Sequence, residues 1–162
     1  MRIGVVSDTH GHMKSTESAV RLLAGQNVAL VLHCGDIGSA AIVSQFSAWP
    51  THFVFGNVDH DEEALDRAIE EAGQTNHRRF GTLALDNREI AFLHSDDREL
   101  FEETIESNRW DVVCYGHTHV AEQHRVGRTL VLNPGALFRA NPRSFAVVDL
   151  ASLEAVHVPL ER

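Results

Sequence analysis

Short apolar runs recur along the whole chain, and most of them are continuous rather than alternating with polar residues. They are rich in Val, Ile, Leu and Phe, and in chain order they read RIGVV, VALVLH, THFVF, IAFLH, WDVVCY, TLVLN, FAVVDL and EAVHVPL. Continuous runs of this length are typical of strands that are buried on both faces. The pattern therefore predicts a sheet that is covered by other layers.

Helical patterns lie between these runs. The segment from Asp61 to Ala72 has one apolar stripe and acidic residues in its first turn, and Gly73 follows it, as expected at the end of a helix. Three further helices are predicted: from about Met13 to Leu23, from a Ser39 cap through Trp49, and after a cap at Asp96 or Asp97. The stretch GTLALDNREIAFLH predicts a hairpin that turns at Asp86-Asn87.

Strands that first alternate with helices and then follow one another predict an α/β layered sandwich. No stretch has the composition of a linker, an internal repeat or a low-complexity segment. With 162 residues, the chain is long enough for one substantial core. We therefore predict a single domain over residues 1–162.

Charge and cysteine content narrow the range of functions. The formal net charge is −9, and no basic stripe stands out, so stable binding of long nucleic acid is not expected. The first apolar run is too short for a signal peptide or a membrane span. Cys34 and Cys114 form no disulfide framework. These features predict a cytoplasmic protein with reduced thiols and no membrane association.

Polar residues that can bind metal follow five of the early strands. They are Asp8 and His10, Asp36, Asn57, His94, and His117 with His119. In layered α/β folds the carboxyl ends of the strands form the edge where ligands bind. Each motif alone has a structural explanation, such as an ordinary turn at Gly35-Asp36 or a satisfied histidine at position 94. The recurrence of such residues at successive strand ends favours a shared site.

The donor set contains oxygen and imidazole nitrogen and no thiolate. Seven ligands are too many for one tetrahedral ion, but they suit two ions that share a bridging carboxylate. Such donors bind manganese, iron, zinc, nickel or cobalt, so the donor set alone does not identify the metal.

The order D-x-H, G-D, G-N, H and G-H-x-H resembles the calcineurin-like metallophosphoesterases, and NPGA at 133–136 resembles a downstream turn of that family. The compact length is similar to the small prokaryotic phosphodiesterase branch. The resemblance implies a four-layer α/β/β/α sandwich, with two mostly buried mixed sheets, around a dinuclear centre. It is also compatible with a homodimer.

The resemblance implies specific ligands. Asp8, His10, Asp36 and His119 would hold one ion, and Asp36 would bridge to a second ion held by Asn57, His94 and His117. Two divalent ions, with manganese favoured, would supply a metal-bound hydroxide that attacks the phosphorus.

Other assignments concern residues beside the ligands. Many family members have histidine, a candidate general acid, where this chain has Val58. This difference predicts either better activity on esters whose leaving group departs easily or protonation of the leaving group by Asp59, His60 or solvent. The expected catalytic residues are Asn57, Asp59 and His94. Arg139 and Arg143 are candidate contacts to the substrate phosphate. His12 and His33 flank ligand positions and either support them or simply pack.

The predicted function is hydrolysis of a small phosphodiester. A phosphomonoesterase or a nuclease could use the same site, and a non-catalytic protein-assembly scaffold could use the same fold. A complete donor set favours the enzyme.

Overall fold

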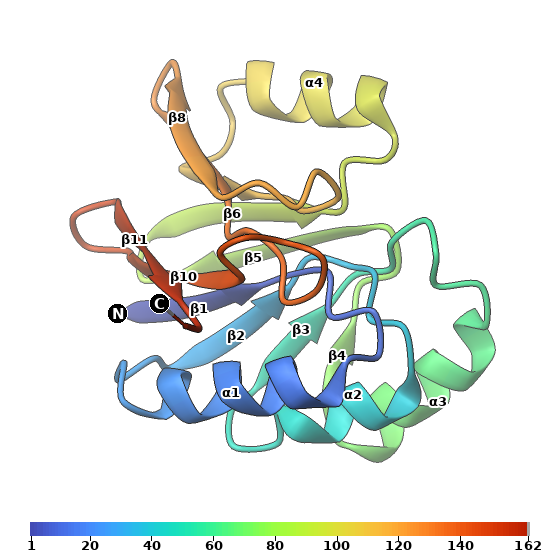
Figure 1. The fold of residues 1–162 in the computed structure, drawn as a ribbon. Helices are drawn as coiled ribbons and strands as arrows, with labels where there is room; N and C mark the ends of the chain where they lie inside the picture. Colours follow the sequence, from blue (N-terminus) through green and yellow to red (C-terminus); the bar gives the residue numbers. More distant parts are fainter. Residues whose placement is uncertain (162) are drawn as a thin grey trace.

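The structure of the protein is a computed structural model that describes residues 1–161. Two mixed sheets lie face to face in its centre (Figure 1). The first has the order β11-β10-β1-β2-β3-β4, with strands β1 (Arg2–Val6), β2 (Leu30–His33), β3 (Thr51–Phe53), β4 (Thr75–Asn76), β10 (Ser144–Asp149) and β11 (Glu154–Pro159). Strands β1 to β4 are parallel, whereas β10 and β11 pair antiparallel.

The second sheet has the order β5-β6-β7-β9-β8. Its strands are β5 (Phe80–Leu85), β6 (Arg88–Leu93), β7 (Val112–Cys114), β8 (Glu122–Val126) and β9 (Thr129–Asn133). The predicted hairpin is confirmed, because β5 and β6 pair antiparallel and both turn residues, Asp86 and Asn87, have positive φ.

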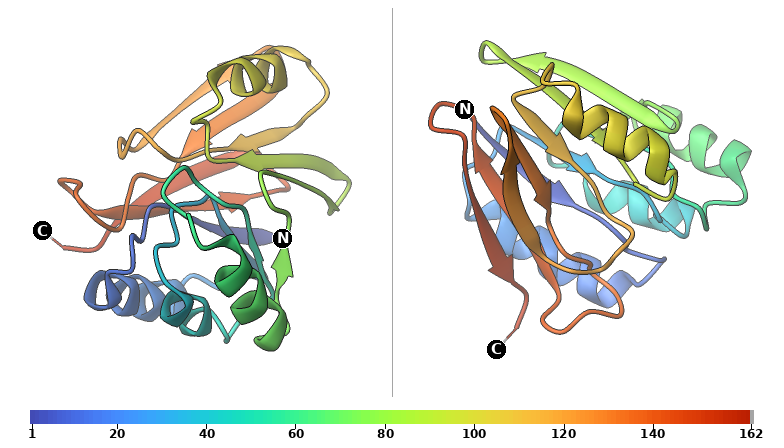
Figure 2. Two further views of the ribbon diagram at one scale, coloured as in Figure 1. Left: turned by 90° about the vertical axis from the view of Figure 1, so that its right-hand side faces the viewer. Right: turned by 90° about the horizontal axis from the view of Figure 1, so that it is seen from above.

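Helices cover the outer faces of both sheets. Helices α1 (Met13–Ala24), α2 (Ala40–Gln45) and α3 (Glu62–Glu71) lie on the first sheet, and α4 (Arg98–Glu106) lies on the second, as the side view in Figure 2 shows. Apolar clusters fill all three interfaces between these layers. The predicted four-layer α/β/β/α sandwich is confirmed.

The helix predicted to reach Trp49 was wrong, because α2 ends at Gln45. Phe46 is fully buried beside the ring of Phe53. The Thr51 hydroxyl donates to the backbone carbonyls of Phe46 and Trp49, at 3.2 and 3.1 Å. These bonds satisfy carbonyl groups of a turn, so the chain leaves the helix early.

Strand β8 was not predicted, because its sequence EQHRV contains no apolar run. It forms an edge of the second sheet and is largely exposed, so burial imposes no apolar pattern on it. Within residues 1–161, no helix has the length and apolar character needed to cross a membrane.

Candidate metal centre

The loops that follow β1, β2, β3, β6 and β7 meet at one edge of the two sheets (Figure 1). Backbone hydrogen bonds tie these loops together. The amides of Asp8 and His10 donate to the carbonyls of Gly35 and Asp36, at 3.0 and 2.9 Å, and the Gly116 amide donates to the His94 carbonyl at 3.2 Å. The residues predicted at five strand ends therefore share one region of the fold.

Each of two aspartates uses one oxygen to fix its position and directs the other into this region. Asp8 is fully buried, and its Oδ2 accepts from Ser7 Oγ at 2.6 Å and from the His117 amide at 3.1 Å. Asp36 Oδ1 accepts from the Val58 amide at 3.0 Å. Asp8 Oδ1 and Asp36 Oδ2 then face the histidines.

The histidines are oriented in the same way. His94 Nδ1 donates to the Cys34 carbonyl at 2.8 Å, and His119 Nδ1 donates to the Arg139 carbonyl at 3.2 Å. Because a carbonyl only accepts, Nδ1 carries the hydrogen in both rings, and the Nε2 lone pair is left free. Such a bond to the second ring nitrogen is typical of metal-binding histidines.

The free atoms converge. His94 Nε2 lies 3.1 Å from Asp36 Oδ2, and His119 Nε2 lies 3.1 Å from Asp8 Oδ1. His10 Nε2 is 3.5 Å from an oxygen of each aspartate and 3.3 Å from His119 Nε2. Asp36 Oδ2 thus lies between His10 and His94, where a bridging carboxylate is expected.

Two atoms at the centre of this cluster lack regular hydrogen bonds within residues 1–161. They are Asp8 Oδ1 and His94 Nε2, and both are buried. Buried polar atoms are rarely unpaired, and both of these offer electron pairs. Two overlapping groups, Asp8-His10-His119 and Asp8-Asp36-His94, have ligand atoms within 4.8 Å of one another. The residues present therefore fit divalent cations.

Asn57 and His117 lie beside these groups rather than within them. Both are exposed, and their Oδ1 and Nδ1 atoms are 3.1 Å apart. The His117 ring centroid is 5.1 Å from that of His94. The two side chains therefore extend the cluster towards solvent on the His94 side.

The charges of the cluster support cation binding. Burial raises the pKa of Asp8, but the surrounding histidines and Ser7 outweigh it and hold that pKa below its ordinary value. The pKa of Asp36 is lowered in the same way, chiefly by His94 against the effect of burial. Burial lowers the pKa of His94, but the two carboxylates outweigh it and raise that pKa. Both carboxylates are ionised at neutral pH.

The backbone of the site is strained. Five of the seven expected ligands have positive φ, which is uncommon for residues other than glycine; they are Asp8, His10, Asp36, His117 and His119. Gly116 is required for a different reason, since a Cβ there would lie 2.7 Å from Asp8 Oδ2 and even closer to Ser7 Oγ.

Asp59 holds two of the ligand-bearing loops together. It is only 3% exposed. Its Oδ2 accepts from the amides of Ile37 and Gly56, at 3.1 and 2.9 Å, and its Oδ1 accepts from the Gly38 amide at 3.0 Å. Because both oxygens already accept backbone bonds, this geometry favours a positioning role over proton donation. His60 is exposed.

The two candidate arginines are placed differently. Arg139 is exposed, and its guanidinium lies 5.2 Å from the centroid of the Phe138 ring, which is 5.6 Å from the His10 ring. Arg143 instead donates to Glu161 at 2.7 Å and lines a separate cleft with His12. The structure brings Arg139, but not Arg143, to the cluster.

The side chains of His12 and His33 form hydrogen bonds with backbone amides, not with the side chains of the expected ligands. His12 caps α1, since its side chain accepts from the Ser15 amide. His33 is fully buried, contacts Thr9 Oγ1 at 3.0 Å and accepts from the Gly35 amide at 3.2 Å. Sequence reasoning missed the role of Ser7, because no spacing marks this residue. Arg79 lies in the stretch NHRRF, whose basic residues are weaker candidates for contact with a substrate phosphate; in the structure it donates to the Gly56 carbonyl at 3.1 Å.

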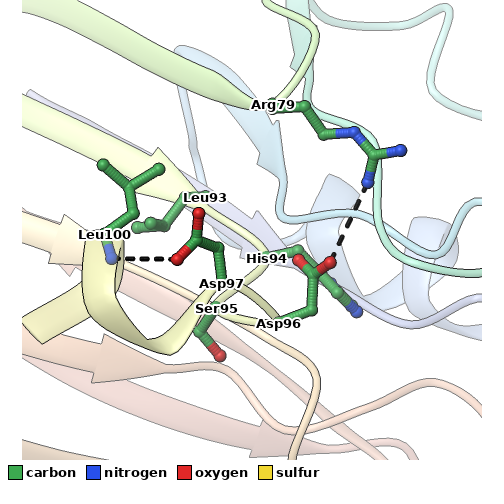
Figure 3. A pocket seen from close by; sticks show the side chains of 7 residues that line it. All are labelled: Arg79, Leu93, His94, Ser95, Asp96, Asp97 and Leu100. Atoms are coloured by element: carbon green, nitrogen blue, oxygen red, sulfur yellow. Dashed lines mark hydrogen bonds and ion pairs between the residues drawn. The ribbon is translucent and has the colours of Figure 1, made fainter.

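A cavity of about 370 Å³ opens beside His94 (Figure 3). Arg79 reaches into it towards Asp96, with 3.9 Å between Arg79 Nη1 and Asp96 Oδ2. A cavity of this volume gives a small ligand room next to the cluster.

The fold and the site together define an α/β sandwich protein with a candidate metal centre at the carboxyl ends of its strands. A model of the calcineurin-like phosphoesterase superfamily domain matches residues 1–153. The chain belongs to this superfamily, and it is a hydrolase of phosphoric esters.

Relatives and solved structures agree with this membership. A phosphodiesterase of Methanocaldococcus jannaschii is 31% identical over 138 residues, 83% of each chain. The structure of an archaeal phosphodiesterase matches with a TM-score of 0.90 and 27% identity, over 98% of this chain and 99% of its own. Vacuolar Protein Sorting 29 from Cryptosporidium parvum, 18% identical, shares the fold with a TM-score of 0.65, over 97% and 95% of the two chains. The predicted resemblance to the small prokaryotic phosphodiesterase branch is confirmed.

Proposed function

We propose that this protein uses two divalent cations to hydrolyse a small phosphodiester. The observation that carries the proposal is the convergence of Asp8 Oδ1, Asp36 Oδ2 and three Nε2 atoms in two overlapping groups. Two of these atoms, Asp8 Oδ1 and His94 Nε2, are buried without a hydrogen-bond partner within residues 1–161. When bound, the cations would acidify a water molecule and neutralise charge on the phosphoryl oxygens.

The residues have distinct parts in this proposal. Asp8, His10 and His119 hold one cation, Asn57, His94 and His117 hold the other, and Asp36 faces both. Asp59 keeps the loops of Asp36 and Asn57 in register through its three backbone bonds. Arg139, stacked on Phe138, supplies positive charge for the substrate phosphate.

The position after Asn57 favours particular substrates. Val58 has no proton to donate, and the carboxylate of Asp59 is occupied by backbone amides. Esters whose leaving group departs without protonation are therefore the preferred substrates, and His60 or solvent protonates the others. Manganese as the metal, a homodimer and a cytoplasmic location stay predictions from the sequence.

The rival functions are less well supported. A net charge of −9 disfavours a nuclease that follows a long phosphate backbone. A scaffold would need only the fold, which Vacuolar Protein Sorting 29 shares. The orientation of the donor atoms in this chain has no role in a scaffold, so the enzyme is the better proposal.

The test is hydrolysis of bis-p-nitrophenyl phosphate by chelator-stripped protein, with and without Mn²⁺. We expect Mn²⁺ to restore turnover in the natural chain and in a control variant at an exposed position, Glu103→Ala, but not in Asp36→Ala. Faster turnover of p-nitrophenyl phosphate than of the diester would favour a phosphomonoesterase. A chain that hydrolyses neither ester with any divalent metal would contradict the proposal.

A further inference from the structure

A second cavity of about 440 Å³ lies between α4 and the loop that carries His117. Ser95 and Asp96 line both this cavity and the one in Figure 3, so the two are neighbours. Its volume is within the range of small-molecule sites and would hold one ring system with its substituents, but not a polymer.

One wall of this cavity is aromatic. The rings of Phe101 and Tyr115 are 4.5 Å apart between centroids, at an interplanar angle of 42°. Tyr115 is 7% exposed, and its hydroxyl donates to Glu122, which fixes the ring. Phe101 is half-buried and packs against the apolar cluster under α4. Phe101 is therefore held by its neighbours and also lines the cavity.

The cavity adjoins the candidate metal centre through His117. This side chain lines the cavity, and its Nδ1 is 3.1 Å from Asn57 Oδ1. A group that occupies the cavity would lie next to a residue that we assign to the second cation.

The charges at the rim argue against a second phosphate in this cavity. Arg98 Nε donates to Glu102 at 2.8 Å, so its charge is already paired. Asp96 adds a further negative charge. Among residues 1–161, the one arginine that lines this cavity is Arg98, which is paired with Glu102, so the aromatic wall suits an uncharged planar group.

We infer that this cavity binds a planar aromatic substituent of the phosphodiester, and that Phe101 determines this specificity. The inference rests on the proposed function, because it assumes that the phosphate of the substrate binds at the candidate metal centre. The shared chemistry is a flat, uncharged ring, which a simple aryl ester and a nucleobase both provide. Ring stacking of this kind favours an aromatic ligand by about tenfold or more over an alkyl analogue.

The test compares the dissociation constants of phenylphosphonate and methylphosphonate, measured by calorimetry on the Mn²⁺-loaded protein. We expect phenylphosphonate to bind about tenfold more tightly. Phe101→Ala and Phe101→Leu should bring the ratio close to one, and Phe101→Leu retains the apolar packing under α4. The control is Phe80→Ala, a half-buried ring in the same cluster that does not line the cavity, and it should keep the ratio. Adenosine 5′-monophosphate against ribose 5-phosphate distinguishes a nucleobase from a simple aryl group.

An unchanged ratio in both Phe101 variants, or no preference in the natural chain, would overturn the inference. The proposed function fails separately. Selective phenylphosphonate binding without hydrolysis of bis-p-nitrophenyl phosphate would contradict the proposed function but support the aromatic subsite. Hydrolysis of this ester, with the same binding ratio in the Phe101 variants as in the natural chain, would support the proposed function but contradict the aromatic subsite.

Discussion

At the scale of single residues, four donors of the cluster are each held by a second bond that directs a free atom inward; they are Asp8, Asp36, His94 and His119. Ser7 fixes Asp8, and the Cys34 carbonyl fixes His94. The motif order predicted which residues lie together, because each motif directly follows an apolar run and so lies at the carboxyl end of a strand. The tautomers, the positive φ values and the role of Asp59 could not be predicted, because they depend on partners distant in the chain.

His33 makes a residue-scale prediction about pH. Burial lowers its pKa from 6.5 to about 3. The other titratable groups that affect it are Asp8, His94, Asp36 and His10. Below pH 6.5 the unfolded chain binds a proton at this site, whereas the folded chain does so only near pH 3. The free energy of unfolding should therefore fall as the pH drops from 6.5, by up to about 1.4 kcal/mol per pH unit from this group.

Replacing His33 should remove that part of the pH dependence. We expect His33→Gln to lose stability at neutral pH but to show a shallower decline between about pH 7 and 5. Urea unfolding of metal-free protein across this range measures the slope. A control variant at an exposed position without an ionisable side chain, Ser152→Ala, should keep the slope of the natural chain. A slope that is unchanged in His33→Gln would show that other groups cause the decline.

At the scale of elements, the carboxyl ends of β1, β2, β3, β6 and β7 place the site, and the apolar runs predicted these strands. Prediction failed where burial does not shape the sequence. The edge strand β8 is polar, and β4 has only two residues. It also failed at α2, because the Thr51 bonds that end this helix come from the next strand.

Helix caps give an element-scale prediction. Asp97 Oδ1 accepts from the Leu100 amide at 3.1 Å at the start of α4 (Figure 3). Ser39 precedes α2 but makes no side-chain cap bond. Asp97→Ala should therefore lower the free energy of unfolding by about 1 kcal/mol, whereas Ser39→Ala should leave it nearly unchanged. Denaturant unfolding of both variants measures this, and equal losses would refute the assigned caps.

At the scale of the whole molecule, the candidate centre spans both sheets. Asp8, His10, Asp36 and Asn57 follow strands of the first sheet, and the remaining histidines follow strands of the second. Cys34 and Cys114 lie in the apolar layer between the sheets. Bound cations would therefore link the two halves of the sandwich. This arrangement agrees with one domain over residues 1–162, which stays a prediction.

The number of cations bound per chain tests the central claim most directly. Calorimetric titration of chelator-stripped protein with Mn²⁺ should give two ions per chain. In Asp36→Ala, which removes an oxygen 3.5 Å from His10 Nε2 and 3.1 Å from His94 Nε2, at least one of the two should be lost. Saturation of the natural chain at one ion, or no measurable binding, would contradict a two-cation phosphodiesterase.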